Sequence, residues 1–312
     1  MTRGEDGATS DRGDIVLLTR IWPHPERPSL GAFVRDRVRG VSGIRVVHPG
    51  PRPGPWPLLY TRMLIDALRM RRIRGVEAHV MAPTGLVGWV AARLRRVPVV
   101  VYAHGGDVRD WERHPLPRRW ATRFVATHVD RVVTNSEDTA RHIRRMGIEP
   151  IVATPGVDLS RFGPTPRPGK RSVLYLGGRS VRKGYAIAAR LAVTLVGPGL
   201  RDVDPADVPA LMDAHDVVLV PSVAEPFGIV AVEAIASGRW VVASAVGGLP
   251  EIVIDGVNGT LVSDGDYEAA LARIPDYDPF AIAPTVDRFS LERWQADLAA
   301  IWDELNGGGP GQ

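Results

Sequence analysis

Residues 216–244 read DVVLVPSVAEPFGIVAVEAIASGRWVVAS, the clearest structural pattern in the chain. The apolar run 217–220 is typical of a strand that is buried on both faces of a parallel sheet. Glu225 follows at the carboxyl end of this strand, a helix then runs to Gly238, and the apolar run 240–243 predicts the next strand. Because ligands of open α/β sheets bind beside the carboxyl ends of strands, we expect Glu225 to lie at a ligand crevice.

Glu225 and Glu233 are eight residues apart, and the predicted helix, with Pro226 in its first turn, places Glu233 in its second turn. Both carboxylates can then face the crevice, and an ionised carboxylate can accept two hydroxyl groups, as in the diols of sugars and riboses. A pair of glutamates on the solvated face of an ordinary helix is the alternative interpretation. Three backbone amides open the helix and favour a phosphate or hydroxyl oxygen. They are those of Phe227, Gly228 and Ile229.

Two sequence patterns carry a family resemblance. Glu225 begins the pattern E-P-F-G-I-V-x-x-E-A-x-A-x-G, and Val241 begins V-V-A-S-x-V-G-G-L-P-E-I-V-x-D-G-x-N-G-x-L-V. They resemble the donor half of the retaining GT-B glycosyltransferases of family 4. The resemblance implies an α/β fold with two Rossmann-like, doubly wound domains facing across a cleft. It also implies a compact member, because one strand-helix unit of the family pattern is absent from 184–216, where base contacts are usual.

Length and composition restrict the class of protein. The chain has 312 residues, more than one hydrophobic core usually holds, so two domains are expected. Cysteine is absent, which excludes disulfides, thiolate metal sites and cysteine nucleophiles. No apolar run has the length of a membrane span, and residues 1–13 lack the apolar segment of a signal peptide. We therefore expect a cytoplasmic protein, with peripheral contact at the inner membrane surface as an open alternative.

Strand and helix patterns alternate through both halves. In the first half the predicted strands are 14–20, 44–49, 78–82, 97–102, 131–134 and 151–154, and the predicted helices are 32–39, 58–73, 86–96, 116–128 and 137–146. With the resemblance, the predicted organisation is a disordered N-terminus at 1–13, an acceptor-side Rossmann-like domain at 14–160, a linker at 161–170, a nucleotide-sugar donor domain at 171–288, a helix at 289–305 that packs back toward the first domain, and a disordered tail at 306–312.

Charge is divided unevenly along the chain. Residues 1–166 carry 27 basic and 16 acidic side chains, a net charge of +11, whereas residues 167–312 carry 12 and 19, a net charge of −7. A basic half suits an anionic partner such as a lipid, a polysaccharide, a protein or a modified nucleic acid. The predicted helix 58–73 is amphipathic with a basic end, so it either covers the sheet or contacts a membrane surface. Solvated helix faces in an arginine-rich chain explain the charge equally well.

A histidine follows one predicted strand of the first domain. Residues 103–107 read AHGGD after the strand 97–102, so they lie at its carboxyl end. The paired glycines, of which Gly105 is the first, permit a tight turn that leaves the side chains of His104 and Asp107 free to face a ligand. The resemblance implies that His104 lies beside the donor sugar, with Gly105 and Asp107 as candidate cleft-lining residues.

Two cations follow the predicted strand that begins the second domain. Arg179 can clamp phosphate oxygens with its planar fork, and Lys183 supplies a point charge. Only two of the 39 basic residues are lysines, and Lys183 is one of them. Together the two cations would stabilise a departing diphosphate. The resemblance implies that Gly31, between the first strand and first helix, approaches this diphosphate, and that Gly248 lines the cleft.

The resemblance implies a retaining hexosyltransferase that moves a sugar from a nucleotide-diphospho-sugar to an acceptor hydroxyl. Its catalytic residues would be His104, Glu225, Arg179 and Lys183, and its donor-binding residues Gly31, Phe227, Gly228, Ile229 and Glu233. Glu233 would hold the ribose diol and Glu225 the sugar hydroxyls, while His104 would bind the sugar and not act as a nucleophile.

No cofactor and no obligatory metal are expected. Three D-x-D sequences occur, but they lie in turn-like stretches and not after convincing strands. They begin at Asp202, Asp264 and Asp276. Two alternatives remain for the function, a nucleotide-sugar epimerase on the same fold and a non-catalytic relic that binds a nucleotide-sugar or a partner. The identity of the acceptor cannot be predicted, because the loops of the first domain, which would select it, carry no recognisable motif.

Overall fold

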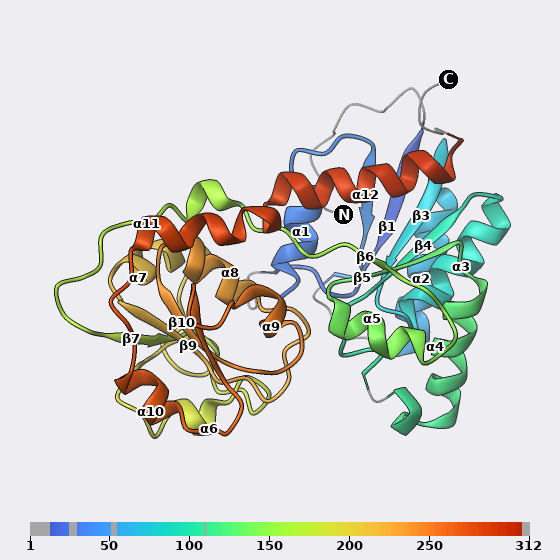
Figure 1. The fold of residues 1–312 in the computed structure, drawn as a ribbon. Coiled ribbons are helices and arrows are strands. Elements are labelled where there is room, and N and C mark those ends of the chain that lie inside the picture. Colours follow the sequence, from blue (N-terminus) through green and yellow to red (C-terminus); the bar gives the residue numbers. More distant parts are fainter. Residues whose placement is uncertain (1–12, 25–29, 51–54, 110, 308–312) are drawn as a thin grey trace. The chain divides into compact units, whose positions relative to one another are not determined.

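The computed structural model describes residues 13–24, 30–50, 55–109 and 111–307. Of the ends predicted as disordered, 1–13 and 306–312, all but residues 13, 306 and 307 lie outside the described residues. The chain divides into two compact units, an N-terminal unit of Met1–Thr154 with Trp294–Gln312 and a C-terminal unit of Pro155–Arg293. Each unit contains one parallel sheet with helices packed on it (Figure 1). The predicted α/β class with two doubly wound sheets is therefore confirmed.

The N-terminal unit is built on a six-stranded sheet in the order β2-β1-β3-β4-β5-β6. Its strands are β1 (Asp14–Leu18), β2 (Ile44–Val47), β3 (Ile73–His79), β4 (Val99–Ala103), β5 (Arg131–Thr134) and β6 (Ile151–Val152). Its helices are α1 (Ala32–Val38), α2 (Trp56–Arg69), α3 (Thr84–Arg95), α4 (Leu116–His128), α5 (Glu137–Arg144) and α12 (Leu291–Leu305), of which Leu291–Arg293 count with the C-terminal unit. β1 pairs with β2 on one side and with β3 on the other, so the order of winding reverses there.

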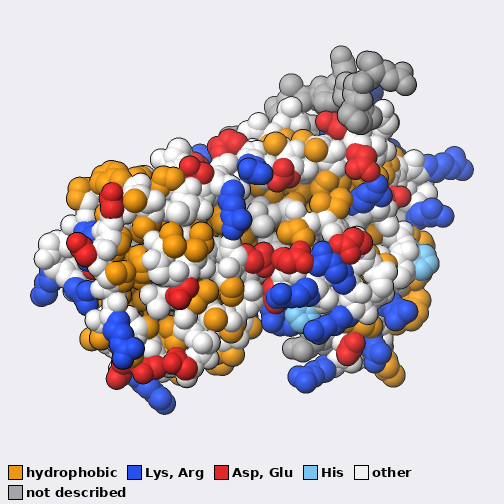
Figure 2. Space-filling model, in the orientation of Figure 1, with side chains coloured by type: hydrophobic (Ala, Val, Ile, Leu, Met, Phe, Trp, Pro, Cys, Tyr) orange, Lys and Arg blue, Asp and Glu red, His pale blue; other side chains and the backbone are white. Residues whose placement is uncertain are grey.

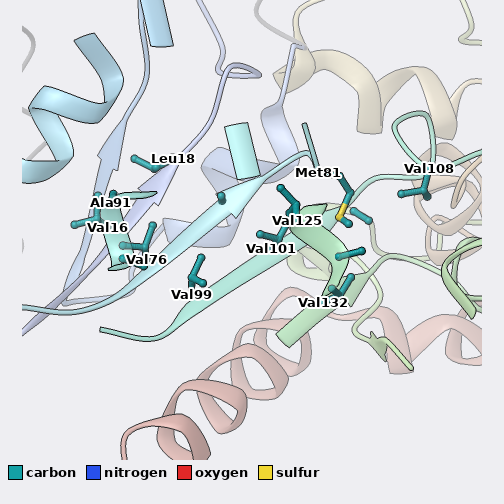
Figure 3. Close-up of a cluster of buried hydrophobic side chains, with 14 of the residues drawn as sticks. Val16, Leu18, Val76, Met81, Ala91, Val99, Val101, Val108, Val125 and Val132 are labelled. Carbon is teal, nitrogen blue, oxygen red and sulfur yellow. The ribbon is translucent and has the colours of Figure 1, made fainter. Parts of the chain in front are cut away.

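One face of this sheet is an apolar core (Figure 3). Val16, Val76 and Val101 come from neighbouring strands, and β-branched residues of this kind pack well on a pleated surface. Ala91 of α3 and Val125 of α4 complete the cluster from the helices above the sheet. Because side chains alternate along a strand, the residues next to these valines in each strand lie on the opposite face of the sheet.

The prediction was wrong at the join between α2 and β3. Helix α2 ends at Arg69 and not at 73, and β3 occupies 73–79 instead of 78–82. The physical reason is that β3 carries two polar side chains, Glu77 and His79, on one buried face, so its sequence resembles that of an exposed polar segment. The apolar Met81 and Ala82, which suggested a strand, lie in the loop after it.

The C-terminal unit is built on a five-stranded sheet in the order β11-β10-β9-β7-β8. Its strands are β7 (Val173–Tyr175), β8 (Thr194–Leu195), β9 (Val217–Val220), β10 (Trp240–Ser244) and β11 (Gly259–Val262). Its helices include α6 (Tyr185–Ala188), α7 (Val208–Asp213), α8 (Ile229–Ala236), α9 (Leu249–Ile252), α10 (Tyr267–Ala272) and α11 (Pro279–Ile282). All residues of β9 are buried in the middle of the sheet, as predicted. β7 has β8 on one side and β9 on the other, so the loops after β7 and β9 leave at a reversal of the winding order.

Helix α8 has glycines at both ends. Gly228 is the N-cap with a φ of 122°, and Gly238 follows the C-cap with a φ of 73°. The amide of Gly238 donates to the carbonyl of Ile235 at 2.8 Å, which satisfies a free carbonyl at the helix end. Pro226 therefore lies in the loop and not in the first turn, because the positive φ of Gly228 delays the helix until Ile229.

Residues 161–170, predicted as a linker, pack instead on the C-terminal unit. Arg167 forms an ion pair with the buried Asp216 at 2.9 Å. The fully buried Arg239 donates to the carbonyl oxygens of Thr165 and Pro166. These contacts hold the segment along the C-terminal unit.

The N-terminal unit presents many basic side chains on the face drawn in Figure 2. Helix α2 exposes Trp56 and Leu58, with exposed fractions of 60% and 65%, and Arg62 and Arg69 are exposed on the same helix. Within the described ranges, no helix has the length and apolar character that a membrane crossing requires.

Candidate active site

Three loops of the C-terminal unit meet at the carboxyl ends of β7, β9 and β10. Gly184 ends the first loop with a φ of 75°, and a side chain there would collide with the Pro221 carbonyl oxygen at the end of β9. The amide of Gly248, in the loop after β10, donates to the Glu225 carbonyl at 3.0 Å. Both positions require glycine, and these contacts fix the three loops relative to one another.

Lys183 and Glu225 are brought together by this arrangement. The Lys183 Nζ lies 2.6 Å from the Glu225 Oε2, and the Ser222 hydroxyl donates to the same oxygen at 3.0 Å. Glu225 is only 5% exposed, whereas the Lys183 side chain is 28% exposed. Among the described residues, the Glu225 Oε1 has no hydrogen-bond partner. One carboxylate oxygen therefore holds the cation, and the other is left to accept a hydroxyl group.

Arg179 does not join the Lys183–Glu225 pair in the part of the chain that the structure describes. It is exposed, its guanidinium lies 5.9 Å from the centre of the Tyr185 ring, and its amide donates to the Pro198 carbonyl at 2.9 Å. An exposed guanidinium on the loop after β7 is free to reorient toward an anionic ligand.

The residues around the start of α8 divide into two kinds. Glu233 lies in the second turn and is half-buried, as predicted for its position. The Phe227 ring is a core side chain, 3% exposed and packed edge-on against Phe289 at 5.5 Å, so only its backbone can serve a ligand. Gly228 and Ile229 form the N-cap and first residue of the helix.

His104 of the N-terminal unit lies directly after β4 in a cluster of rings. Its ring stacks on Tyr102 with centroids 4.8 Å apart, and the edge of Phe33 packs against it at 4.9 Å. Phe33 stands in the first turn of α1, for which Gly31 is the N-cap with a φ of 68°. A side chain at Gly31 would collide with the Ile21 carbonyl. The structure thus brings the start of α1 next to His104.

The prediction that the Asp107 side chain is free was wrong. Its Oδ1 accepts the His104 amide at 3.0 Å, and its Oδ2 accepts the Met81 amide at 2.8 Å. Burial raises the pKa of Asp107, although these backbone hydrogen bonds oppose the rise. The physical reason is that the His104 amide in the tight turn at Gly105, and the Met81 amide in the loop after β3, both need an acceptor. Asp107 therefore shapes the turn that presents His104.

The sequence analysis missed a chain of buried polar groups behind His104. The His79 Nδ1 lies 2.9 Å from the His104 Nε2, and the His79 Nε2 lies 3.1 Å from the Glu77 Oε1. The other Glu77 oxygen receives Arg37 of α1 at 3.4 Å and the indole of Trp302 of α12 at 3.1 Å. The signal that could have found them is the alternation of Glu77 and His79 within an otherwise apolar strand.

The charges in this chain of groups are set by burial and pairing. Burial alone would raise the pKa of Glu77, but Arg37, the His79 hydrogen bond and the Trp302 indole hold it at about 2. Burial lowers the pKa of His104 well below its usual value. Glu77 is therefore ionised and His104 neutral near pH 7.

Comparison with family models gives matches in both halves. Residues 9–161 match the model described as Glycosyltransferase Family 4, and residues 200–277 match the model described as Glycosyl transferases group 1. The second match includes Glu225 and Glu233, and the first includes His104.

Curated relatives include the D-inositol 3-phosphate glycosyltransferases of Mycobacterium tuberculosis and Mycobacterium bovis. Each is 33% identical over 234 residues, which cover 58% of this chain and 49% of the relative. The chain thus matches about half the length of these relatives.

Two solved structures illustrate the shared fold. HepE of Anabaena in complex with UDP and glucose is 20% identical with a TM-score of 0.70, over 94% of this chain and 100% of that chain. Sucrose-phosphate synthase of Thermosynechococcus elongatus is 20% identical with a TM-score of 0.74, over 96% of this chain and 100% of that chain. The chain therefore matches a family 4 model followed by a group 1 model, and it shares the fold of these solved structures.

Proposed function

We propose that this protein transfers a hexose from a nucleotide-diphospho-sugar to an acceptor hydroxyl with retention of the anomeric configuration. The observation that carries the proposal is the Lys183–Glu225 pair, 2.6 Å apart, on the two loops that leave the sheet where its winding order reverses. In doubly wound folds this is the place where nucleotides bind. The group 1 match over 200–277 supports a donor site in this unit.

Each residue receives a role in the donor complex. Lys183 and Arg179 neutralise the diphosphate, and Glu233 accepts the ribose diol. The Glu225 Oε2 holds Lys183, and its Oε1 accepts a hydroxyl of the transferred sugar. In this proposal His104 also binds the transferred sugar, and Gly31 approaches the diphosphate.

The proposed reaction needs no protein nucleophile. The bond between the anomeric carbon and the diphosphate oxygen breaks, and a bond from the acceptor oxygen forms on the same face of the sugar. The acceptor proton passes to the departing diphosphate oxygen, whose charge Lys183 and Arg179 stabilise.

The reaction also requires no obligatory metal in this proposal, because two cationic side chains on the loop after β7 supply positive charge for the diphosphate. A rate that EDTA abolishes and Mg²⁺ or Mn²⁺ restores would contradict it.

A phosphorylated polyol is the acceptor class we test first. The first 166 residues carry a net charge of +11, which favours an anionic substrate. The curated relatives named above act on D-inositol 3-phosphate, and this supports the same class.

The N-terminal unit also contacts an anionic membrane surface in this proposal. The exposed Trp56 and Leu58 of α2 stand on the same helix as Arg62 and Arg69, a combination that suits the lipid interface. Co-sedimentation with phosphatidylglycerol vesicles, but not with phosphatidylcholine vesicles, is expected. A Trp56→Ala, Leu58→Ala variant that sediments unchanged would contradict this contact.

A donor panel tests the function directly. UDP-, GDP-, ADP- and TDP-sugars are incubated with D-inositol 3-phosphate and other polyols, and products are identified by mass spectrometry. The anomeric configuration is then read by NMR. Glu233→Ala should abolish transfer with the successful donor, while the surface variant Glu304→Gln should not. An epimerised sugar that forms without acceptor, or donor binding with no turnover in any combination, would favour the two alternatives to transfer.

A further inference from the structure

The side chains of Glu77, His79 and His104 form a continuous hydrogen-bonded line, here named the relay. The distances along it are 3.1 Å from Glu77 to His79 and 2.9 Å from His79 to His104. Glu77 is 1% exposed and His79 fully buried, so solvent cannot replace either bond. His104 is only partly buried and forms the outer end of the relay.

The direction of each hydrogen bond follows from the charge at the inner end. Glu77 is ionised, since Arg37 and its other partners hold its pKa at about 2, and a carboxylate can only accept. The His79 Nε2 must therefore carry a hydrogen. A neutral imidazole carries only one, so the His79 Nδ1 accepts.

Neutral His79 is also the form that balances charge. The Arg37 guanidinium, 3.4 Å from the Glu77 carboxylate, already balances its negative charge. A second proton on the fully buried His79 would therefore leave a positive charge that no group compensates. Tyr102, which stacks on His79 at 5.4 Å, is neutral because burial raises its pKa.

The His104 Nε2 then donates to the His79 Nδ1, which leaves the His104 Nδ1 without a hydrogen. Among the described residues, no hydrogen-bond partner faces this nitrogen. The Tyr102 ring, stacked at 4.8 Å, and the Phe33 ring, packed edge-on at 4.9 Å, hold the plane of the His104 ring. The lone pair of the Nδ1 therefore has one direction.

We propose that Glu77 and His79 are positioning residues that lock His104 in the Nε2–H tautomer, so that its Nδ1 is an obligate acceptor for a hydroxyl group of the transferred sugar. This inference rests on the proposed function for its ligand. It makes His104 selective for a sugar that donates a hydroxyl hydrogen at this position, and it excludes His104 as an acid that protonates the leaving group.

The first arm of the test needs no ligand. Nitrogen NMR of the full-length protein labelled in its eight histidines distinguishes a protonated ring nitrogen from an unprotonated one. The signals are assigned from the spectra of His104→Gln and His79→Phe. We expect wild-type His104 and His79 each to carry hydrogen on Nε2 alone. A hydrogen on the His104 Nδ1 overturns the proposal, whatever the enzyme transfers.

The second arm uses UDP-glucose and its monodeoxy analogues. His79→Phe keeps a ring beside Tyr102 but removes both hydrogen bonds, so kcat/KM for UDP-glucose should fall about tenfold, the loss that one hydrogen bond explains. For the analogue that lacks the recognised hydroxyl, wild type and variant should have the same kcat/KM. An equal loss with every donor would show a structural role only and overturn the proposal.

The matched control is Tyr102→Phe. It keeps the stacked ring and loses only the hydroxyl that donates to the Ala153 carbonyl. We expect this variant to lose stability while the His104 tautomer and the preference among deoxy analogues stay unchanged. If the expected tautomer is found but no donor of the panel binds, the proposed function fails and the relay does not.

Discussion

The two lysines of the chain have opposite environments, which makes them a natural pair for mutation. Lys183 lies 2.6 Å from the buried Glu225 carboxylate, whereas Lys170 is exposed on the segment before β7. Lys183→Ala should weaken UDP binding about tenfold to a hundredfold, because a charge-assisted hydrogen bond to phosphate contributes about 1.5–3 kcal/mol. Calorimetric titration with UDP measures this. Lys170→Ala should bind as wild type, and equal losses in the two variants would remove Lys183 from the donor site.

Glu77 makes the stability of the N-terminal unit depend on acidity. Its pKa is lowered from about 4.5 to about 2 in the folded protein, so its stabilising contribution is complete above pH 4.5 and is lost as the pH falls toward 2. The shift corresponds to about 3 kcal/mol of unfolding free energy. Urea unfolding from pH 7 to pH 3 should therefore show a steeper decline for wild type than for Glu77→Gln. Glu304→Gln, at an exposed ion pair, should follow wild type. Parallel curves for all three proteins would contradict the buried pairing.

At the scale of elements, the β7–α6 loop depends on Gly184. Its φ of 75° and its contact with the Pro221 carbonyl admit no side chain, whereas Gly256 has a φ of 74° and open space around it. Gly256→Ala should cost about 1–2 kcal/mol from the left-handed backbone alone. Gly184→Ala should cost more and should also abolish UDP binding, because the loop that carries Lys183 must move away from β9. Urea unfolding and UDP titration of both variants separate strain from collision. Equal losses in the two variants would contradict the close approach.

Elements with local patterns could be predicted from the sequence, and those fixed by distant partners could not. Helix α4 and strands β5 and β9 have the predicted bounds, since each follows a periodic or continuous apolar run. Strand β3 was misplaced because the partners of Glu77 come from α1 and α12, far away in the chain. For the same reason the sequence indicated Lys183 and Glu225 separately, while the pairing of β7 with β9 brings them together.

At the scale of the molecule, α12 returns the chain from the C-terminal unit to the N-terminal one. Trp302 of this helix is 1% exposed, donates to Glu77 and lies where a side chain at Gly75 would stand. The last helix of the sequence therefore completes the first unit and closes the inner end of the relay. The N-terminal unit is consequently built from two segments that lie far apart in the sequence.

Trp302→Ala should destabilise the N-terminal unit alone. Truncation of a buried tryptophan leaves a cavity and costs about 3–5 kcal/mol. Hydrogen exchange followed by mass spectrometry should show faster exchange in peptides from β3 and β4 and unchanged exchange in β9 and β10, because Trp302 belongs to the first unit. Trp56→Ala, at a site that is 60% exposed, should leave both sets unchanged. Faster exchange spread equally over both units would mean that they unfold as one cooperative body. The packing of α12 on the N-terminal unit would then stabilise both units and not the first alone.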